Sequence, residues 1–266
     1  MHSCKGQWLG GQVRAYVTCP STQPIAWQWV QQHAPHGSVV VASEQTAGRG
    51  RLQRGWWTGE GGLAMSIVLR PQNLLRVQSL GLVVAVGLLD VLQRHGLVGK
   101  IKWPNDVLLP IPSSCLCVAV TQNHGKWAGI LPQSAWSGTQ LQAVVLGIGM
   151  NVQRPCLQLP NMAQRAIFLS DCGVAITPQL FAVDVLQALQ QVLQQACDAA
   201  GWQQLQARAK QHCITLGQQV CVRQGDRVWQ GRAVDITATG ALLLQLPNAT
   251  RQQIDAGEAT VVAHSR

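Results

Sequence analysis

A stretch rich in glycine and arginine, residues 44–57, carries the clearest chemistry in the sequence. It reads Glu-Gln-Thr-Ala-Gly-Arg-Gly-Arg-Leu-Gln-Arg-Gly-Trp-Trp and lies between two apolar runs, 38–43 and 62–69, that predict strands. Its glycines let the backbone bend sharply and approach a ligand. Its three arginines offer planar donor forks that fit carboxylate or phosphate oxygens. The stretch predicts an anion-binding lid; a solvated, mobile loop is the alternative.

A second polar cluster, residues 102–106, reads Lys-Trp-Pro-Asn-Asp. Trp103 must be extended because it precedes a proline, and residues 104–106 predict a turn between two strands. Asn105 and Asp106 then serve either the turn alone or a ligand. The unusual sequence Trp-Pro-Asn-Asp favours the ligand.

A third group of candidates lies on two further expected strands. Residues 123–125, Asn-His-Gly, predict a hairpin turn, and Lys126 begins the returning strand, 126–131. Lysine is scarce in this chain, which favours a role for Lys126 over simple solvation. The buried run 141–152 contains two glycines separated by one residue, a spacing that lets a flat ring or sugar lie against the strand. The phosphate-binding fingerprints GxGxxG and GxxxxGK[ST] are absent from the sequence.

The pattern of secondary structure expected from the sequence changes near residue 215. Ser21 or Thr22 caps a helix over 25–30, contacts a ligand, or does both. From residue 216, short strands alternate with Gly and Asp turns, which indicates a small β-barrel. The chain therefore divides into domains 1–214 and 215–266. Further expected elements are helices over 76–94, 178–200 and 202–211 and a strand over 114–120.

The amino-acid composition limits the classes of protein to which this chain can belong. The 266 residues are 47% hydrophobic and suit one large domain plus a small one. A net charge of +9 predicts anionic partners, such as nucleotides, nucleic acid or acidic proteins, but no run of consecutive basic residues indicates a DNA-binding arm. The nine cysteines lack zinc or redox spacing, so we expect reduced cysteines in a cytoplasmic protein. We expect no signal peptide and no membrane span, since the apolar run 80–92 is short and contains Asp90.

Four motifs, taken in this order, resemble the biotin–protein ligase (holocarboxylase synthetase) family: residues 45–51, 102–106, 126–131 and 147–151. The resemblance extends from about residue 18 to about residue 265. It implies an α+β fold of the class II synthetase-like type, with a mixed sheet flanked by helices and a C-terminal SH3-like barrel. It also implies that biotin and ATP give biotinyl-5′-AMP and pyrophosphate, after which a lysine of a biotin carboxyl carrier protein, that of acetyl-CoA carboxylase, takes the biotin.

The resemblance also implies the site residues. The biotin-binding set is Ser21, Thr22, Gln23, Gln45, Gly48, Arg49, Gly50, Arg51, Lys126, Gly129 and Leu131. The nucleotide-binding set is Arg49, Arg54, Trp56, Asn105, Lys126, Gly147, Gly149 and Asn151. Two anionic groups, the biotin carboxylate and the α-phosphate, must meet, so the catalytic candidates include the cations Arg49, Arg51 and Lys126, with Mg²⁺ adding charge. Asp106 is the candidate for orienting or deprotonating the carrier lysine.

The sequence departs from the family pattern at two positions, and it leaves alternatives. Leu52 replaces a basic residue and Gln133 stands where an acidic one is common, so family contacts are not carried over there. Ser21 and Thr22 fall where the family places its first biotin contact, which leaves no room before them for a helix-turn-helix domain, and we expect no specific DNA binding. The oligomeric state stays open, with a homodimer among the alternatives.

Two rival functions have different discriminating features. A lipoate ligase or octanoyltransferase shares the expected fold, but the Gly-Arg-Gly-Arg loop and Trp-Pro-Asn-Asp argue against it. A non-enzymatic RNA-binding protein would need aromatic stacking platforms on the small barrel. After residue 216 the chain has a single tryptophan, Trp229, so this alternative is the weaker one.

Overall fold

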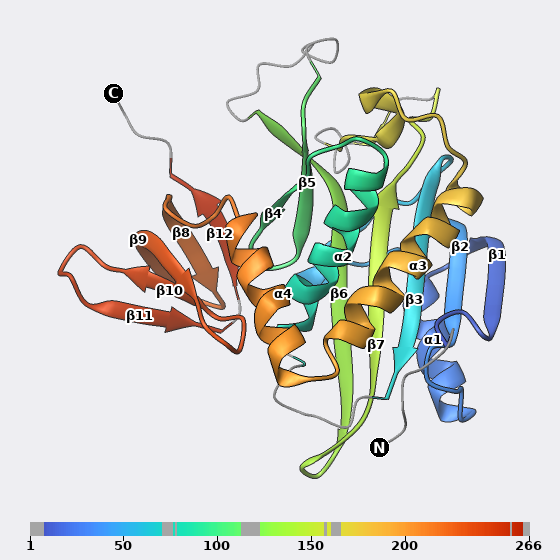
Figure 1. The fold of residues 1–266 in the computed structure, drawn as a ribbon, viewed down its shortest axis with the longest axis horizontal. Helices are drawn as coiled ribbons and strands as arrows, with labels where there is room; N and C mark the ends of the chain where they lie inside the picture. Colours follow the sequence, from blue (N-terminus) through green and yellow to red (C-terminus); the bar gives the residue numbers. More distant parts are fainter. Residues whose placement is uncertain are drawn as a thin grey trace.

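Two β-sheets organise the protein in a computed structural model that describes residues 8–70, 77, 79–112, 123–156, 159–160, 166–255 and 257–262 (Figure 1). The larger sheet has seven strands in the order β1-β2-β3-β7-β6-β5-β4. Only β1 and β2 run parallel; the other neighbours are antiparallel. The expected mixed sheet is therefore confirmed. Its strands are β1 (Val13–Cys19), β2 (Val39–Gln45), β3 (Gly62–Leu69), β4 (Lys100–Lys102), β5 (Asp106–Pro110), β6 (His124–Ser137) and β7 (Gln140–Asn151).

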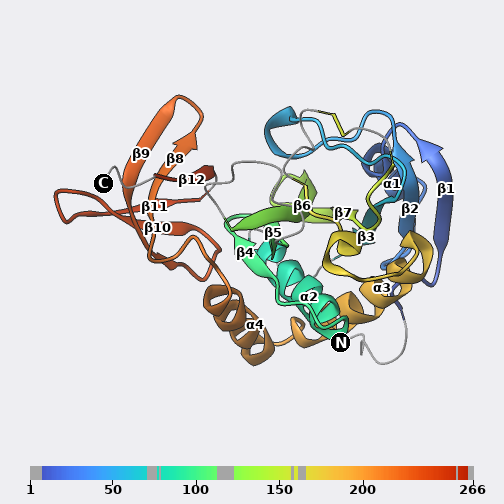
Figure 2. The ribbon, with the colours of Figure 1, turned by 90° about the horizontal axis from the view of Figure 1, so that it is seen from above.

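Helices cover both faces of this sheet because its strands are apolar on both sides. Successive strand residues point to opposite faces. Val39 packs in the large cluster of α2 (Leu80–Arg94) and α3 (Pro178–Gln195), whereas Val40 packs with Ala26 and Trp29 of α1 (Thr22–Gln31). Helices α2 and α3 lie side by side on one face (Figure 2). Near-continuous apolar runs such as Gly62–Leu69 are what a sheet covered on both faces requires.

Several helix boundaries differ from the sequence prediction: α1 begins at Thr22 rather than at residue 25, and α4 (Ala199–Gln211) begins at Ala199 rather than at residue 202. Helix α2 begins at Leu80 rather than at residue 76; Val77 and Ser79 lie in a turn, and residues 76 and 78 lie outside the described residues. Helix α3 ends at Gln195, and the next helix is α4. Asp198 causes this break, because its carboxylate accepts the Gly201 N–H at 2.7 Å and so caps α4.

The second sheet confirms the expected small β-domain. All its neighbouring strands are antiparallel, in the order β11-β10-β9-β8-β12. It forms the separate lobe after α4 (Figure 1). Its strands are β8 (Gln219–Gln224), β9 (Arg227–Ile236), β10 (Leu242–Gln245), β11 (Arg251–Ile254) and β12 (Glu258–Val261).

Trp103 connects the two domains through hydrogen bonds. It is 1% exposed, its backbone N–H donates to Thr215 Oγ1 at 3.0 Å, and its indole Nε1 donates to Gly240 O at 2.9 Å. Truncating a buried aromatic side chain to alanine typically costs about 3–5 kcal/mol. The Trp-Pro-Asn-Asp segment is thus anchored on one side by the C-terminal domain, which fixes the position of the two polar residues that follow.

The predicted hairpin turn at residues 123–125 is wrong. His124 and Gly125 are already part of β6 and pair with Pro110 and Leu109 of β5. The β5–β6 ladder carries a register shift between Val107 and Leu108, and a glycine inside a strand often marks such an irregularity. Two residues of this turn-favouring sequence, His124 and Gly125, therefore lie in a strand. The expected strand over 114–120 lies outside the described residues.

The described part of the chain bears on the expectations about membrane spans and about reduced cysteines. None of the helices described there is long and apolar enough to cross a bilayer. Among the described residues, Cys19, Cys156, Cys213 and Cys221 are free thiols.

His36 should make the stability of the fold depend on pH. Its Nδ1 accepts the Arg70 backbone N–H at 3.0 Å, and its ring stacks on Trp8. Burial, and then the Arg70 charge, lower the pKa of His36, whereas in the unfolded chain this pKa is about 6.5. As the pH falls through about 6.5, the unfolded chain binds a proton that the folded chain does not, so the free energy of unfolding falls.

A His36→Gln variant should show a smaller difference between its unfolding free energies at pH 7.5 and pH 5.5 than the parent chain. Urea unfolding at the two pH values measures both differences. Part of the dependence should remain, because burial and nearby Lys100 also lower the pKa of His124 and of His212. An identical difference in the variant and the parent would exclude His36 as a source.

Candidate functional site

One cavity brings the sequence candidates together. It has a volume of about 620 Å³ and is formed by the N-terminus of α1, the loop after β2, and strands β5, β6 and β7. Of all the residues predicted for the site, only Gly48 does not line it. The predicted residues that do are Ser21, Thr22, Gln23, Gln45, Arg49, Gly50, Arg51, Arg54, Trp56, Asn105, Asp106, Lys126, Gly129, Leu131, Gly147, Gly149 and Asn151.

The end of the cavity at α1 is a preorganised network of neutral polar groups. Thr22 and Gln45 lie at its centre: the Thr22 N–H donates to Gln45 Oε1 at 2.8 Å, and the Thr22 hydroxyl lies 2.8 Å from Ser66 Oγ. Gln45 Nε2 in turn donates to Thr58 Oγ1 at 3.2 Å. Ser21 occupies the predicted N-cap position of α1 with an extended backbone, but its side chain makes no cap hydrogen bond. Gln45 satisfies the helix N-terminus instead.

Gln23 completes this end and explains one strand glycine. Its Nε2 donates to Leu131 O at 2.9 Å and to Val145 O at 3.4 Å, so the amide is held against β6 and β7. A Cβ at Gly147 would lie 2.4 Å from Gln23 Oε1, far inside any ordinary contact. Gly147 therefore makes room for the Gln23 side chain.

The second strand glycine makes room for an indole ring from the loop. A Cβ at Gly149 would lie 2.2 Å from the Trp56 ring, and one at Gly129 would lie 3.0 Å from it. Trp56 Nε1 is buried and has no hydrogen-bond partner. The expectation that a flat ring lies against this strand is met here by the protein's own tryptophan, within a cavity that stays open around it.

Lys126 and Asp106 form the charged centre of the site. Lys126 Nζ lies 2.7 Å from Asp106 Oδ1 and 5.1 Å from the Trp56 ring centroid. The side chains are 38% and 21% exposed, so both remain accessible from the cavity. Asn105 Nδ2 donates to Ile130 O at 2.9 Å, which ties the turn after Trp103 to β6.

Asn151 supports Lys126 from the neighbouring strand. It is 4% exposed, and its Nδ2 donates to the Lys126 carbonyl at 3.2 Å. Asn151 also lines the cavity, so its amide links the cavity wall to the backbone of Lys126.

The arginine loop is held in place by contacts at both ends. Gly48 O accepts the Trp56 N–H at 2.9 Å, and Gly50 N–H donates to Arg54 O at 2.8 Å. Arg51 Nη1 donates to Gly257 O of the C-terminal domain at 3.3 Å, so the loop touches both domains. Gly48 lies next to the cavity and allows a close approach of the two ends of the loop, since a Cβ there would lie 2.4 Å from Trp56 O.

Both departures from the family pattern have local contacts or exposure that account for them. Leu52 is 67% exposed and adopts a left-handed conformation (φ 53°) in the 3₁₀ turn η1 (Arg51–Gln53). Gln133 Oε1 accepts the Trp27 indole N–H at 2.9 Å. Leu52 lines the cavity, whereas Gln133 does not.

Sequence reasoning missed several lining residues. His124 lies on the same face of β6 as Lys126, two residues away, a spacing that could have identified it. Burial, and then the charge of Lys100, lower its pKa, which favours a neutral imidazole. Lys102 and Ala166 also line the cavity, as do Gly257 and Ala259 from the other domain. No local pattern marks the last two, because they reach the site only through domain packing.

The cavity is strongly basic. Its described lining carries five basic side chains and one carboxylate, that of Asp106; the basic ones are Arg49, Arg51, Arg54, Lys102 and Lys126. Among the residues that the structure describes, no cluster of three or more His, Cys, Asp or Glu could hold a metal ion. The surplus of basic side chains gives the cavity a charge that suits an anionic ligand.

Comparison with known proteins gives two family matches. Residues 15–151 match the model of the Biotin/lipoate A/B protein ligase family, and residues 215–261 match that of the Biotin protein ligase C terminal domain. A biotin–[acetyl-CoA-carboxylase] ligase of Paracoccus denitrificans is 35% identical over 231 residues, covering 82% of this chain and 88% of the relative. The bifunctional ligase/repressor BirA of Bacillus subtilis is 28% identical over 91% of this chain and 71% of its own length.

Solved structures show the same fold. A biotin protein ligase from Aquifex aeolicus in complex with biotin and ATP superposes with a TM-score of 0.76 at 24% identity, covering 95% of this chain and 99% of the other. A biotin acetyl coenzyme A carboxylase synthetase from Helicobacter pylori with bound biotinylated ATP gives a TM-score of 0.60 at 16% identity, covering 91% and 99%.

Proposed function

Because the chain belongs to the Biotin/lipoate A/B protein ligase family and contains the C-terminal domain of biotin protein ligases, we propose that it activates biotin with ATP and transfers it to a carrier lysine. The observation that carries the proposal is the basic cavity at the glycine-bearing strand, with its neutral polar end at Thr22 and Gln45. Biotin has an uncharged ureido ring and an anionic tail, which matches these two ends. The C-terminal domain match and the biotin ligase relatives favour biotin over lipoate.

In this proposal the neutral end holds the biotin ring and the basic centre holds the acyl-adenylate. Thr22, Gln23 and Gln45 offer donors and acceptors already oriented by their own hydrogen bonds, and preorganised groups lose little freedom on binding. Arg49, Arg51 and Lys126 line the same cavity and would face the junction where the carboxylate meets the α-phosphate. Trp56, Asn105 and Asn151 would border the nucleotide.

The first reaction step needs charge compensation rather than a protein nucleophile. The biotin carboxylate oxygen attacks the α-phosphorus of ATP, the bond to the β-phosphate oxygen breaks, and pyrophosphate leaves. Negative charge concentrates on the phosphoryl oxygens, and fixed cations nearby stabilise that charge most when water is excluded. Holding two anions together in the correct geometry supplies much of the acceleration.

Magnesium enters the proposal as part of the substrate MgATP. The carboxylate of Asp106 is the one acidic group in the described cavity lining, and it is paired with Lys126. Mg²⁺ commonly binds substrate phosphates and waters with few protein ligands, so this lining is compatible with a metal that arrives on the triphosphate.

The experiment that tests the function uses a purified biotin carboxyl carrier domain. The protein, MgATP and the carrier are incubated with biotin or, in a parallel sample, with lipoate, and the carrier is weighed by mass spectrometry. We expect one biotinyl group on the carrier lysine and no lipoyl group. A lipoylated carrier and an unmodified carrier in the biotin sample would replace the proposal with the lipoate ligase alternative.

We further propose that the loop over residues 46–57 is a lid that is ordered by the acyl-adenylate. Three arginines of like charge stay close together more easily once an anion lies among them. Ordering a loop costs roughly 1–2 kcal/mol per residue, so biotin alone should order it less than biotinyl-AMP does. A closed lid would keep water from the mixed anhydride.

Limited trypsin digestion measures this closure. Cleavage after Arg49, Arg51 and Arg54 should be fastest in the free protein, slower with biotin and slowest with biotinyl-AMP, because proteolysis follows the open population. Cleavage after Arg227, the first residue of β9 in the C-terminal domain, is the internal control and should not change. Equal loop cleavage in all three states would mean that the loop is not a lid.

The domain division at residue 214/215 is proposed as a functional one. The C-terminal domain supplies Gly257 and Ala259 to the cavity wall and accepts a hydrogen bond from Arg51. We propose that it assists nucleotide or carrier binding without contributing catalytic groups. The carrier is proposed to be that of acetyl-CoA carboxylase, after the named activity of the Paracoccus relative. The cytoplasmic location, the absence of specific DNA binding and a homodimer stay predictions.

A further inference from the structure

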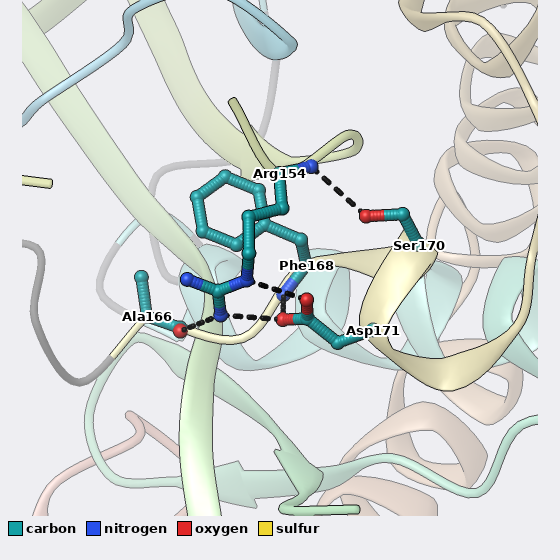
Figure 3. Close-up of polar contacts among 5 residues, drawn as sticks. All are labelled: Arg154, Ala166, Phe168, Ser170 and Asp171. Atoms are coloured by element: carbon teal, nitrogen blue, oxygen red, sulfur yellow. Dashed lines mark hydrogen bonds and ion pairs between the residues drawn. The ribbon is translucent and has the colours of Figure 1, made fainter. Parts of the chain in front are cut away.

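An ion pair outside the cavity organises the segment behind Lys126. Arg154 follows the end of β7, and its guanidinium binds both oxygens of Asp171, with Nε 2.5 Å from Oδ1 and Nη2 2.6 Å from Oδ2 (Figure 3). The Asp171 side chain is only 5% exposed. The same carboxylate accepts the Phe168 N–H at 2.8 Å. Its lone pairs are thus well occupied, as a buried carboxylate requires.

Arg154 also holds the neighbouring backbone directly. Its Nη2 donates to Ala166 O at 3.2 Å, its backbone N–H donates to Ser170 Oγ at 2.9 Å, and its guanidinium lies over the Phe168 ring, 4.7 Å from the centroid (Figure 3). Residues 166–168 are therefore fixed from one side by a single arginine and its carboxylate partner.

The other side of this segment is bonded to Lys126. Ala166 forms a parallel bridge with Lys126, and the Ile167 N–H donates to Lys126 O at 3.0 Å. That carbonyl also accepts from Asn151 Nδ2 at 3.2 Å. The two hydrogen bonds fix the backbone from which the lysine side chain extends to Asp106. A shift of residues 166–168 would shift Lys126.

We propose that Arg154 and Asp171 are positioning residues for Lys126. They act through the backbone of residues 166–167 and touch no substrate themselves. The inference rests on the proposed function, in which Lys126 stabilises the transferring phosphoryl group. Catalytic cations must be held to a fraction of an ångström, and supporting partners of catalytic groups are commonly worth 10–100-fold in activity. A purely structural ion pair would instead change stability without a specific link to Lys126.

A double-mutant cycle separates these two roles. Arg154→Gln is made in the parent chain and in the Lys126→Ala chain, and single-turnover adenylation is measured by pyrophosphate release alongside biotin affinity and melting temperature. We expect Arg154→Gln to slow adenylation about 10-fold in the parent chain and less than about 2-fold in the Lys126→Ala chain, since coupled residues are not additive. Biotin affinity should change little in both.

Two further variants keep the test decisive. The double variant Arg154→Gln/Asp171→Asn leaves no unpaired buried carboxylate. It can replace the single variant if Arg154→Gln alone folds poorly, and we expect the same loss in the adenylation rate. Arg154→Lys keeps the charge but not the fork, and it should recover only part of the rate. Arg208→Gln is the matched control, because Arg208 pairs with Asp90 between α4 and α2, away from the cavity.

The outcomes are distinguishable. The positioning role is overturned if Arg154→Gln reduces the adenylation rate by the same factor in both chains, or does not reduce it in the parent chain. The proposed role of Lys126 would then still stand. If Lys126→Ala itself leaves adenylation unchanged, the role of Lys126 in the proposed function fails first, and the positioning role fails with it. A loss caused by Arg208→Gln equal to that caused by Arg154→Gln would assign the effect to general stability.

Discussion

Lys126→Ala should reduce the rate of adenylate formation by about 10²–10³-fold, the scale observed when one well-placed charge stabiliser is removed. Lys126 extends from β6 into the basic cavity, 2.7 Å from Asp106 and beside the glycines that open the strand surface. Its backbone carbonyl is fixed by Asn151 and Ile167. A cation held in this way stabilises the charge that develops on the phosphoryl oxygens without having to move during the step.

The measurement is pyrophosphate release in a single turnover with saturating biotin and MgATP. Lys210→Ala is the matched control, because Lys210 Nζ also lies 2.7 Å from a carboxylate, Asp235 Oδ1, but in a pair outside the cavity. The control should stay within about 2-fold of the parent rate, as expected for a surface ion pair. Adenylation by Lys126→Ala within a few-fold of the parent would remove Lys126 from the mechanism.

Local patterns predicted the strands that carry the site. The apolar run 62–69 corresponds to β3 residue for residue, because a strand buried on both faces leaves a continuous signal. Gly147 and Gly149 marked a strand that something must approach closely, and side chains of Gln23 and Trp56 do so. Seventeen of the predicted site residues line one cavity, because the loop after β2 and the start of α1 meet the neighbouring strands β6 and β7 there.

Features that depend on contacts between distant segments left no local signal. The pairing of Arg154 with Asp171 and the contact of Arg51 with Gly257 join residues far apart in the sequence. The Asn-His-Gly sequence at 123–125 fits a tight turn locally, yet pairing with β5 draws His124 and Gly125 into β6. Capping by Ser21 was similarly plausible, but Gln45 takes over that role from another strand. In each case the tertiary partner outweighs a local preference of comparable strength.

Asp106→Asn should slow the transfer of biotin from biotinyl-AMP to the carrier by about 10²-fold, the lower range for general acid–base catalysis, and should slow adenylation less. The attacking carrier lysine has an ordinary pKa of about 10.4 and is protonated at neutral pH. It must lose a proton before its nitrogen attacks the acyl carbon and AMP leaves. Asp106 offers the one carboxylate in the described cavity lining.

The pH dependence of the transfer step separates a base from a structural aspartate. If Asp106 accepts or directs the lysine proton, raising the pH supplies more free amine, and transfer by Asp106→Asn should recover about tenfold per pH unit between pH 7 and pH 9, with a shallower rise in the parent. Preformed biotinyl-AMP with excess carrier isolates this step from adenylation. Asp235→Asn breaks the equivalent Lys210 pair outside the cavity and should leave both steps unchanged. Equal losses in the two half-reactions of Asp106→Asn, with no recovery at high pH, would instead assign Asp106 to holding Lys126 in place.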